Sequence, residues 1–276
     1  VKANLKRYKA AVLKAAVEGR LVETEADLAR REGRSFETGA QLLQRILEDR
    51  RSQWKGKGKY KEPAVPDTTD LPELPEGWVW ATLEQIGQEG RPIIYGIIKP
   101  GPHDPNGVPY VRVTEMKNGF VDLLNLRKAA PERAAKFARA TLAAGDVLIS
   151  KDGTIGRVAV VPPQLAGGNI TQHVMRAPVN ELMSRDYVVW AIRSDVCQRW
   201  LTGETRGVAL RGVNVEDFRR LPIPVPPVTE QHRIVGEVDR RVSIAEEAEA
   251  QVDANHKRVQ ILRGAVLSNA FQNKQL

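Results

Sequence analysis

The sequence contains few of the groups that build covalent or metal cross-links. Its 276 residues include a single cysteine, Cys197, so no disulfide can form within the chain and no zinc site built on cysteine pairs is encoded. Nothing in the composition indicates an oxidising compartment. We therefore expect a cytoplasmic protein.

Long apolar runs are also lacking. No stretch approaches the roughly 18 consecutive apolar residues that a membrane-spanning helix needs. The first 20 residues interleave lysine and arginine with apolar positions, whereas a signal peptide has an uninterrupted apolar block. The sequence thus predicts neither a membrane protein nor a secretion signal.

Most motifs of catalytic sites are missing as well. The sequence has no GxxxxGK[ST] phosphate loop, no HExxH zinc motif, no GxSxG nucleophile elbow, no glycine-rich cofactor loop and no Asn/Asp-Pro-Pro-aromatic tetrapeptide of an amino methyltransferase. Asp146, Lys151 and Asp152 approach a nuclease centre, but Ile149 occupies the position where a metal-dependent nuclease usually has a carboxylate. We therefore expect no catalytic residue, no bound metal and no cofactor.

The charge is positive but unevenly distributed. The net charge of +8 arises largely in residues 1–61, whereas residues 62–77 hold five acidic residues and neither lysine nor arginine. The long middle segment, residues 78–228, is only mildly basic. Its charge permits contact with nucleic acid without requiring it.

The C-terminal residues carry the clearest periodic pattern. After the proline-rich run 221–227, Thr229 can cap a helix, and no proline follows it. Apolar or small residues then recur mostly three and four positions apart, in a narrow stripe typical of a coiled coil. A helix that continues to about Phe271 would be on the order of 60 Å long, more than a globular core requires. We predict that this stripe packs against a partner helix through Ile234, Val238, Val242, Ala245, Val252, Val259, Leu262 and Val266.

The two ends of the chain resemble each other. Residues 5–22 and 259–276 align without a gap, with four identities that include Ala11 with Ala265. The match is either a coincidence between alanine-rich helices or a sign that residues 1–22 end a second long helix in a repeated unit. On the second interpretation, the first copy of the unit precedes residue 1.

Residues 23–77 separate this N-terminal segment from the middle of the chain. Thr38–Arg51 has apolar residues on one face and predicts a short helix. Alternating lysines and glycines follow, and then an acidic stretch with prolines, a composition typical of an extended linker. We place a domain boundary at the end of this linker.

Residues 78–228 have the pattern of a mixed domain. Short apolar runs at Pro109–Thr114 and Asp146–Ser150 are separated by glycine-rich turns, and a helical run lies near Arg185–Leu201. The sequence therefore predicts the α+β class. The expected architecture is one mixed α/β recognition domain followed by a long coiled-coil-type spacer helix at residues 229–276.

A glycine-rich turn follows one of the apolar strands. Residues 151–157 expose small and charged side chains, and the cations Lys151 and Arg157 can neutralise phosphates. Backbone N–H groups near Gly153 and Gly156 can also donate to phosphate oxygens. The structural alternative is a common two-residue hairpin turn at the Asp-Gly dipeptide.

Three further segments supply candidate contacts with DNA. Residues 169–173 carry amide and imidazole groups that can read base edges, or that can instead satisfy backbone groups in a β-rich core. Residues 95–103 and 203–212 place cations in loops, which either line a groove or form solvated turns. The predicted DNA-binding residues are Tyr95, Lys99, Arg112, Lys151, Thr154, Arg157, Gln172, His173, Arg206 and Arg211.

Several stretches, in their order along the chain, resemble the specificity subunit of type I restriction-modification systems. They are LPEGWVWATL (residues 74–83), YVRVTEMKNG (110–119), GDVLISKDGTIGRVAVV (145–161), NITQHV (169–174) and LPIPVPPVTEQHRIV (221–235). LKAAVEGRLV (13–22) is similar to the helix end that precedes a second recognition domain in this family. Together these stretches cover nearly the whole chain.

The resemblance implies a function and partners. A full subunit holds two target recognition domains joined by two long antiparallel helices, so residues 78–228 would be one such domain and residues 229–271 the spacer helix. It also implies binding to double-stranded DNA and docking to methyltransferase subunits, which supply S-adenosylmethionine chemistry, and through them to the restriction subunit. Base-reading residues vary within the family, so the resemblance identifies no base contact.

The chain departs from the family in its length. It resembles either the C-terminal half of a larger subunit or a half-subunit that pairs with a second copy through the long helix, in which case two copies would read a palindrome. We expect a non-enzymatic DNA-recognition subunit. The alternatives are a coiled-coil adaptor without sequence preference and, less favoured, a metal-dependent nuclease.

Overall fold

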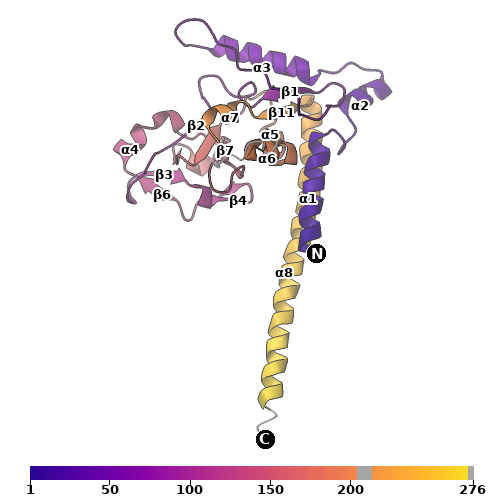
Figure 1. The fold of residues 1–276 in the computed structure, drawn as a ribbon, viewed down its shortest axis with the longest axis vertical. Helices are drawn as coiled ribbons and strands as arrows, with labels where there is room; N and C mark the ends of the chain where they lie inside the picture. The colour runs from indigo at the N-terminus through magenta and orange to yellow at the C-terminus, as the bar shows by residue number, and fades with distance from the viewer. Residues whose placement is uncertain (204–212, 273–276) are drawn as a thin grey trace.

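Two segments from opposite ends of the sequence lie side by side as antiparallel helices. The computed structural model describes residues 1–203 and 213–272, with side chains to residue 264. Helix α1 (Lys2–Val17) runs along the first part of α8 (Val228–Gln272), and the rest of α8 projects beyond the N-terminus (Figure 1). Lys9 Nζ lies 3.0 Å from Glu249 Oε2, and Lys2 pairs with Asp253. The predicted long helix is confirmed.

The start of α8 differs from the sequence prediction. The helix begins at Val228, and the Gln231 N–H donates to the Pro227 carbonyl at 3.0 Å. Thr229 therefore lies inside the first turn, and its side chain hydrogen bonds to the Glu25 carboxylate. The prediction that Thr229 caps the helix is wrong. Thr229 is already helical, and its hydroxyl hydrogen bonds to the Glu25 carboxylate.

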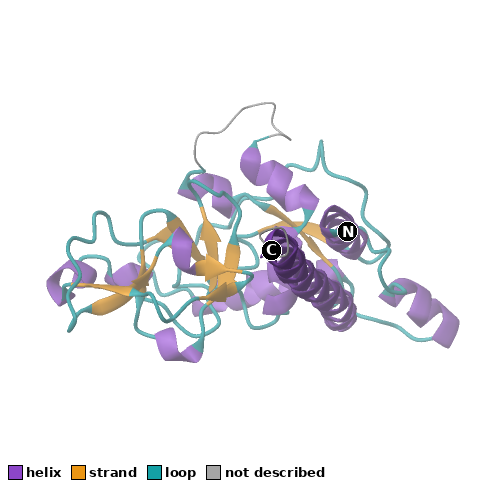
Figure 2. Cartoon of the chain, turned by 90° about the horizontal axis from the view of Figure 1, so that it is seen from below, coloured by secondary structure: helices purple, strands orange, loops and turns teal. Residues whose placement is uncertain are grey.

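A body of short strands and helices lies to one side of the helix pair (Figure 2). Its largest sheet has the order β2-β10-β7-β8 and is antiparallel throughout, with β2 (Ile94–Tyr95), β7 (Val147–Ser150), β8 (Val158–Val160) and β10 (Val174–Ala177). A second sheet, β6-β3-β9, contains β3 (Val108–Val111), β6 (Arg127–Ala129) and β9 (Asn169–Ile170), with β3 and β9 parallel. Two antiparallel pairs complete the strands: β1 (Val79–Thr82) with β11 (Pro222–Val225), and β4 (Met116–Lys117) with β5 (Phe120–Val121).

Short helices surround these strands. They are α2 (Glu25–Glu32), α3 (Gly39–Gln53), α4 (Pro131–Ala135), α5 (Arg185–Arg193), α6 (Asp195–Thr202), α7 (Val215–Arg219) and the 3-10 turns η1 (Val113–Glu115), η2 (Ala138–Ala140) and η3 (Pro163–Leu165). The predicted helix at 38–51 is confirmed as α3. Thr38 and Gln41 form a capping box at its start, and Leu42 and Ile46 are fully buried.

The predicted helical run at 185–201 is two helices. The Ser194 hydroxyl donates to the Ala191 carbonyl at 2.6 Å, and its backbone N–H donates to the same oxygen at 3.1 Å. These bonds replace the next helical hydrogen bond, so α5 ends and α6 starts in a new direction. The predicted strand at 109–114 is likewise shorter, because η1 follows β3.

One hydrophobic cluster joins the helix pair to the body. Val12 of α1, Ile46 of α3, Ile149 of β7, Ile192 of α5 and Val238 of α8 all belong to it. Residues 54–77 contain neither helix nor strand, but the Trp80 indole N–H donates to the Pro72 carbonyl at 3.2 Å and ties this stretch to β1. Within the described residues, no helix is long and apolar enough to cross a membrane.

Candidate nucleic-acid interface

Four loops meet at one end of the four-stranded sheet. Ser150 at the end of β7 faces Val174 at the start of β10, and Tyr95 at the end of β2 faces Met175. The chain therefore leaves β2 and β7, and enters β10, at the same end of the sheet. We call the surface formed there by residues 95–99, 112–115, 151–157 and 171–173 the loop face.

Residues 171–173 hold the loop face together through their backbone. Thr171 donates to Val111 at 3.0 Å, and Gln172 donates to Ile97 at 3.0 Å. The Lys151 N–H donates to the His173 carbonyl at 3.0 Å. These bonds bring predicted DNA-binding residues from four separate segments into one surface.

The turn at 151–157 carries an aspartate-histidine pair. Asp152 Oδ2 lies 2.7 Å from His173 Nδ1 and 3.3 Å from Lys151 Nζ. Burial raises the pKa of Asp152, but the hydrogen bond from His173 and the charge of Lys151 outweigh it, so the net pKa is lowered. The carboxylate therefore stays ionised and holds the exposed imidazole at the rim of the turn.

This turn differs from both structural expectations for it. Seven residues connect β7 to β8, so the two-residue hairpin at Asp-Gly is wrong. The Gly156 N–H donates to the Ser150 carbonyl at 3.0 Å, so it is not available to a phosphate as expected. Thr154 is exposed, and its carbonyl accepts the Ser150 hydroxyl.

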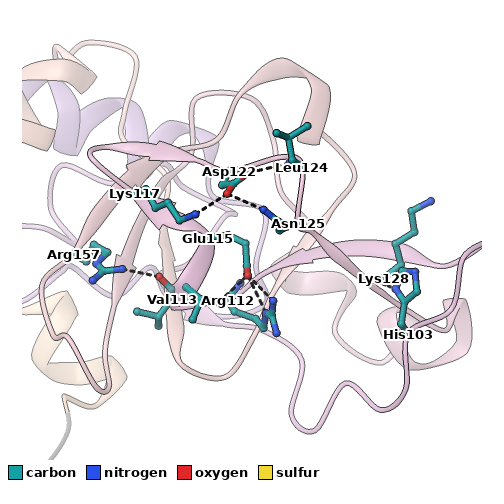
Figure 3. A network of polar contacts seen from close by, with 11 residues as sticks. His103, Arg112, Val113, Glu115, Lys117, Asp122, Leu124, Asn125, Lys128 and Arg157 are labelled. Carbon is teal, nitrogen blue, oxygen red and sulfur yellow. Dashed lines mark hydrogen bonds and ion pairs between the residues drawn. The ribbon is translucent and has the colours of Figure 1, made fainter. Parts of the chain in front are cut away.

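Two of the predicted arginines have partners within the protein. Arg157 Nη1 donates to the Val113 carbonyl at 3.1 Å (Figure 3) and to the Met116 carbonyl at 3.1 Å. Arg112 Nη2 donates to Glu115 Oε1 at 2.6 Å. Burial raises the pKa of Glu115, but the hydrogen bonds from the Arg112 guanidinium, the Thr114 hydroxyl and the Arg112 N–H together lower it by more, so the charge of Arg112 is balanced by a buried, ionised carboxylate.

The remaining predicted residues of the loop face differ in exposure. Lys99 is exposed with a left-handed backbone (φ 49°), whereas Tyr95 is half-buried. Gln172 is half-buried, and its Oε1 has no hydrogen-bond partner within the described residues. Asn169, by contrast, is buried and bonds to the Phe137 carbonyl through Nδ2 at 3.2 Å. The core-satisfying role thus falls to Asn169, whereas Gln172 remains a predicted base contact.

Arg206 and Arg211 lie outside the described residues. The next described residue, Val213, donates its N–H to the Lys151 carbonyl at 3.3 Å. Val213 is therefore anchored at the loop face.

Sequence reasoning missed two cations beside the loop face. Lys117 and Arg193 line a pocket of about 540 Å³ together with Arg157. Lys117 lies in a Lys-Asn-Gly turn, a signal that could have marked it. Arg193 lies in a helix with no motif, and it reaches the pocket because α5 packs against β8.

The predicted seam of α8 is covered over part of its length. Ile234, Val238, Val242 and Ala245 are buried, and Val252 is half-buried, in the part of α8 that α1 accompanies. Further along, Val259 and Leu262 are exposed (60% and 59%), and the side chain of Val266 lies outside the described residues. The last turns of the seam thus present apolar side chains to the surroundings.

The geometry does not support a nuclease centre at Asp146. Its carboxylate is buried and pairs with both Arg91 Nη atoms, at 2.8 and 2.7 Å. Asp146 precedes β7 and Asp152 follows it, so the two carboxylates lie at opposite ends of the strand. In the part of the chain that the structure describes, no three His, Cys, Asp or Glu side chains form a metal-binding group.

The fold and the loop face together define an α+β recognition-type domain carried on a helical spacer. The family model for the type I restriction modification DNA specificity domain matches residues 75–251, and the chain belongs to this family. The resemblance seen in the sequence is therefore confirmed.

Curated relatives agree with this assignment. The chain is 29% identical over 271 residues to the type I restriction enzyme EcoBI specificity subunit of Escherichia coli, covering 98% of this chain and 50% of that protein. It is 26% identical over 276 residues to the EcoEI specificity subunit of the same organism, covering 94% and 43%. The chain thus spans about half the length of these relatives.

The structural neighbour bears on the fold. It belongs to a study of complex assembly and conformational transition of the type I R-M system, with a TM-score of 0.52, 20% identity, and coverage of 93% of this chain and 56% of that one. The predicted α+β class with a long helix is confirmed by this likeness and by the elements described above.

Proposed function

We propose that this chain recognises DNA sequence as part of a type I restriction-modification complex and reads one half of a bipartite target. The observation that carries the proposal is that the matched family domain, residues 75–251, contains the whole loop face. Polar side chains from four segments converge there on one surface, as base reading requires.

The loop face divides into two kinds of contact. Lys99 and Lys151 are suited to phosphates because neither is enclosed in a buried ion pair. Gln172 and His173 carry the groups that pair with base edges. With four to six phosphate contacts, the binding constant should fall with a log-log salt slope of about −4 to −5.

The same proposal assigns the chemistry to partners. The chain would dock to methyltransferase subunits, and through them to the restriction subunit, so that methylation and cleavage take place on those proteins. We infer that the chain itself is non-catalytic and that it acts in the cytoplasm, where the DNA lies.

The test is co-expression with the methyltransferase subunit encoded beside it, followed by mapping of methylated bases across the host genome. A split motif with methylation in each half is the expected result. Methylation without a motif, from a complex that still co-purifies, would refute sequence recognition by this chain.

A second candidate function is a protein-binding coiled-coil adaptor. The exposed apolar residues Val259, Ile261 and Leu262 of α8 favour it, because such side chains usually meet a partner. An adaptor would bind DNA of every sequence equally. Comparing the affinity for the mapped motif with that for a scrambled duplex separates the two functions.

A further inference from the structure

A cationic pocket adjoins the loop face between the β4–β5 hairpin and the corner of α5 and α6. Its volume is about 540 Å³, and its polar lining consists of Lys117, Asn118, Arg157, Arg193 and Gln198. No carboxylate is among the described residues that line it. The lining is therefore suited to an anion.

Arg193 is the least satisfied of these cations. It is half-buried, and its guanidinium stacks on the Trp190 ring at 4.4 Å. Burial lowers its pKa, although an arginine keeps its charge, and within the described residues it makes neither a hydrogen bond nor an ion pair. A partly desolvated guanidinium without an acceptor costs free energy unless a ligand supplies one.

The neighbouring groups hold the pocket open. Asn118 and Gly119 have left-handed backbones (φ 51° and 91°), which turn the hairpin at the pocket rim. A Cβ on Gly119 would lie 3.3 Å from Arg193 Nη1, so the backbone passes directly beside the guanidinium. Gln198 Nε2 donates to the carbonyls of Gly156 and Ile192, at 3.0 and 2.7 Å, and fixes the opposite wall.

The other two cations flank Arg193 and are fixed in place. Arg157 Nη1 is bonded to two carbonyls, and in the described part of the chain its other nitrogens have no protein partner. Lys117 Nζ pairs with Asp122 Oδ2 at 2.8 Å, a contact drawn in Figure 3. The pocket lining thus carries more positive than negative charge.

We propose that this pocket binds one phosphate of the DNA backbone, with Arg193 as the main ligand and Arg157 and Lys117 beside it. Arg157 belongs to both the pocket and the loop face, so a strand crossing that face passes the pocket. The fork of a guanidinium matches two phosphate oxygens. The inference rests on the proposed function, since it specifies how the same DNA is held.

The position of Arg193 gives this contact a structural consequence. Arg193 lies on α5, and Trp190, on which it stacks, donates its indole N–H to Asp239 of α8 at 2.9 Å. The phosphate site is thereby fixed relative to the spacer helix. Phosphate contacts set the register of a protein on the duplex, so this one sets the path of the DNA along the spacer.

The experiment measures binding of the complex to fluorescent duplexes that carry the motif or a scrambled sequence, over a range of salt concentrations. Arg193→Gln should lower the affinity for both duplexes by about fivefold, because one phosphate contact is lost. The log-log salt slope should also become shallower by about 0.9. Arg199→Gln is the matched control: Arg199 is exposed on α6 and pairs with Asp195 at 2.8 Å. It should bind as the wild type does.

A second variant keeps the test valid if Arg193→Gln does not fold. Asn118→Asp adds a carboxylate at the exposed rim of the pocket, in a left-handed backbone conformation that aspartate tolerates. It should lower the affinity for both duplexes by more than Arg193→Gln does. Wild-type affinity and slope in both variants would overturn the inference and leave the proposed function intact. A wild-type complex that does not bind DNA would overturn both.

Free phosphate is the other source of the same ligand chemistry. Inorganic phosphate should protect the wild type against thermal unfolding no better than chloride at equal ionic strength. Protection that Arg193→Gln abolishes, with DNA affinity unchanged, would assign the pocket to the free anion and overturn the DNA contact.

Discussion

At the scale of single residues, Gln172 is the side chain whose change should alter sequence preference. Its Oε1 is buried and lacks a partner among the described residues, while its backbone is fixed to Ile97. Gln172→Ala should reduce discrimination at one base pair by about 1–3 kcal/mol and leave binding to scrambled DNA unchanged. Genome methylation mapping would show one motif position becoming degenerate.

Lys99→Gln is the matched variant for this test. Lys99 is exposed at the same loop face, and a phosphate contact there carries no sequence information. Lys99→Gln should therefore lower the binding affinity for every duplex by the same factor. Equal discrimination by the Gln172→Ala complex and the wild type would remove Gln172 from the base-reading residues.

Glu115 should control the acid stability of the loop face. Its pKa is lowered because Arg112, Thr114 and the Arg112 N–H together outweigh its burial, so its stabilising effect is present above pH 4.5 and is lost as the pH falls through its folded-state pKa. Glu115→Gln should cost about 1–3 kcal/mol in the free energy of unfolding at pH 7, because the charged hydrogen bonds weaken.

The measurement is urea unfolding of both proteins at pH 7 and at pH 3.5. The difference in the free energy of unfolding should narrow at pH 3.5, which lies below the ordinary glutamate pKa of 4.5, because the carboxylate of the unfolded wild-type chain is then largely protonated. Glu181→Gln, at an exposed position, should match the wild type at both values. A difference that is the same at both values would show that the charge of Glu115 is not involved.

Residue chemistry explains why the sequence identified the segments of the site better than the contacts within it. Lys151, Arg157 and His173 were predicted from residue type and turn position, and the structure brings them together. That Arg157 would bond to two carbonyls, or that Gly156 would bond to Ser150, depends on contacts between distant segments. Arg193 has no local signal, because its role follows from the packing of α5.

At the scale of elements, the turn between β7 and β8 should depend on its two glycines to different extents. Both have left-handed φ values, 69° for Gly153 and 79° for Gly156. A Cβ on Gly153 meets nothing within 4 Å, whereas one on Gly156 would overlap the Gln198 amide and displace its bonds. Gly153→Ala should therefore cost only the backbone strain, about 1–2 kcal/mol.

Gly156→Ala should be more destabilising than Gly153→Ala, because it adds this overlap to the same strain. It should also weaken DNA binding through the displaced Arg157 loop. Thermal unfolding and duplex binding of the two variants provide the comparison. Equal melting temperatures would show that Gln198 moves away without cost.

The elements differ in how far the sequence could predict them. The long helix and α3 were predicted because their apolar periodicity extends over many residues and α3 has a capping box. The break between α5 and α6 was not, because a single serine bonding back to Ala191 leaves the apolar pattern unchanged. Two-residue strands such as β2 and β9 depend on tertiary pairing and have too few residues for a periodic signal.

At the scale of the whole molecule, α1 covers only the first part of the apolar seam of α8, and this predicts self-association. The seam is buried where α1 accompanies it, whereas Val259 and Leu262 remain exposed beyond. Burying such side chains on association stabilises a dimer by about 1.5–3 kcal/mol for each fully buried side chain. We therefore expect the purified chain to form a concentration-dependent dimer in analytical ultracentrifugation.

A double variant tests whether the seam is responsible. Val259→Lys combined with Leu262→Lys places charges on the exposed seam and should shift the chain to monomer, whereas Ile244→Lys should not. Ile244 is also an exposed apolar residue of α8 (54%), but it lies outside the stripe, so it controls for apolar surface alone. Two copies paired through this seam would present two loop faces related by a twofold axis, and the methylated motif would then be palindromic. A wild-type chain that is monomeric at all concentrations would instead require a different partner for these turns of α8.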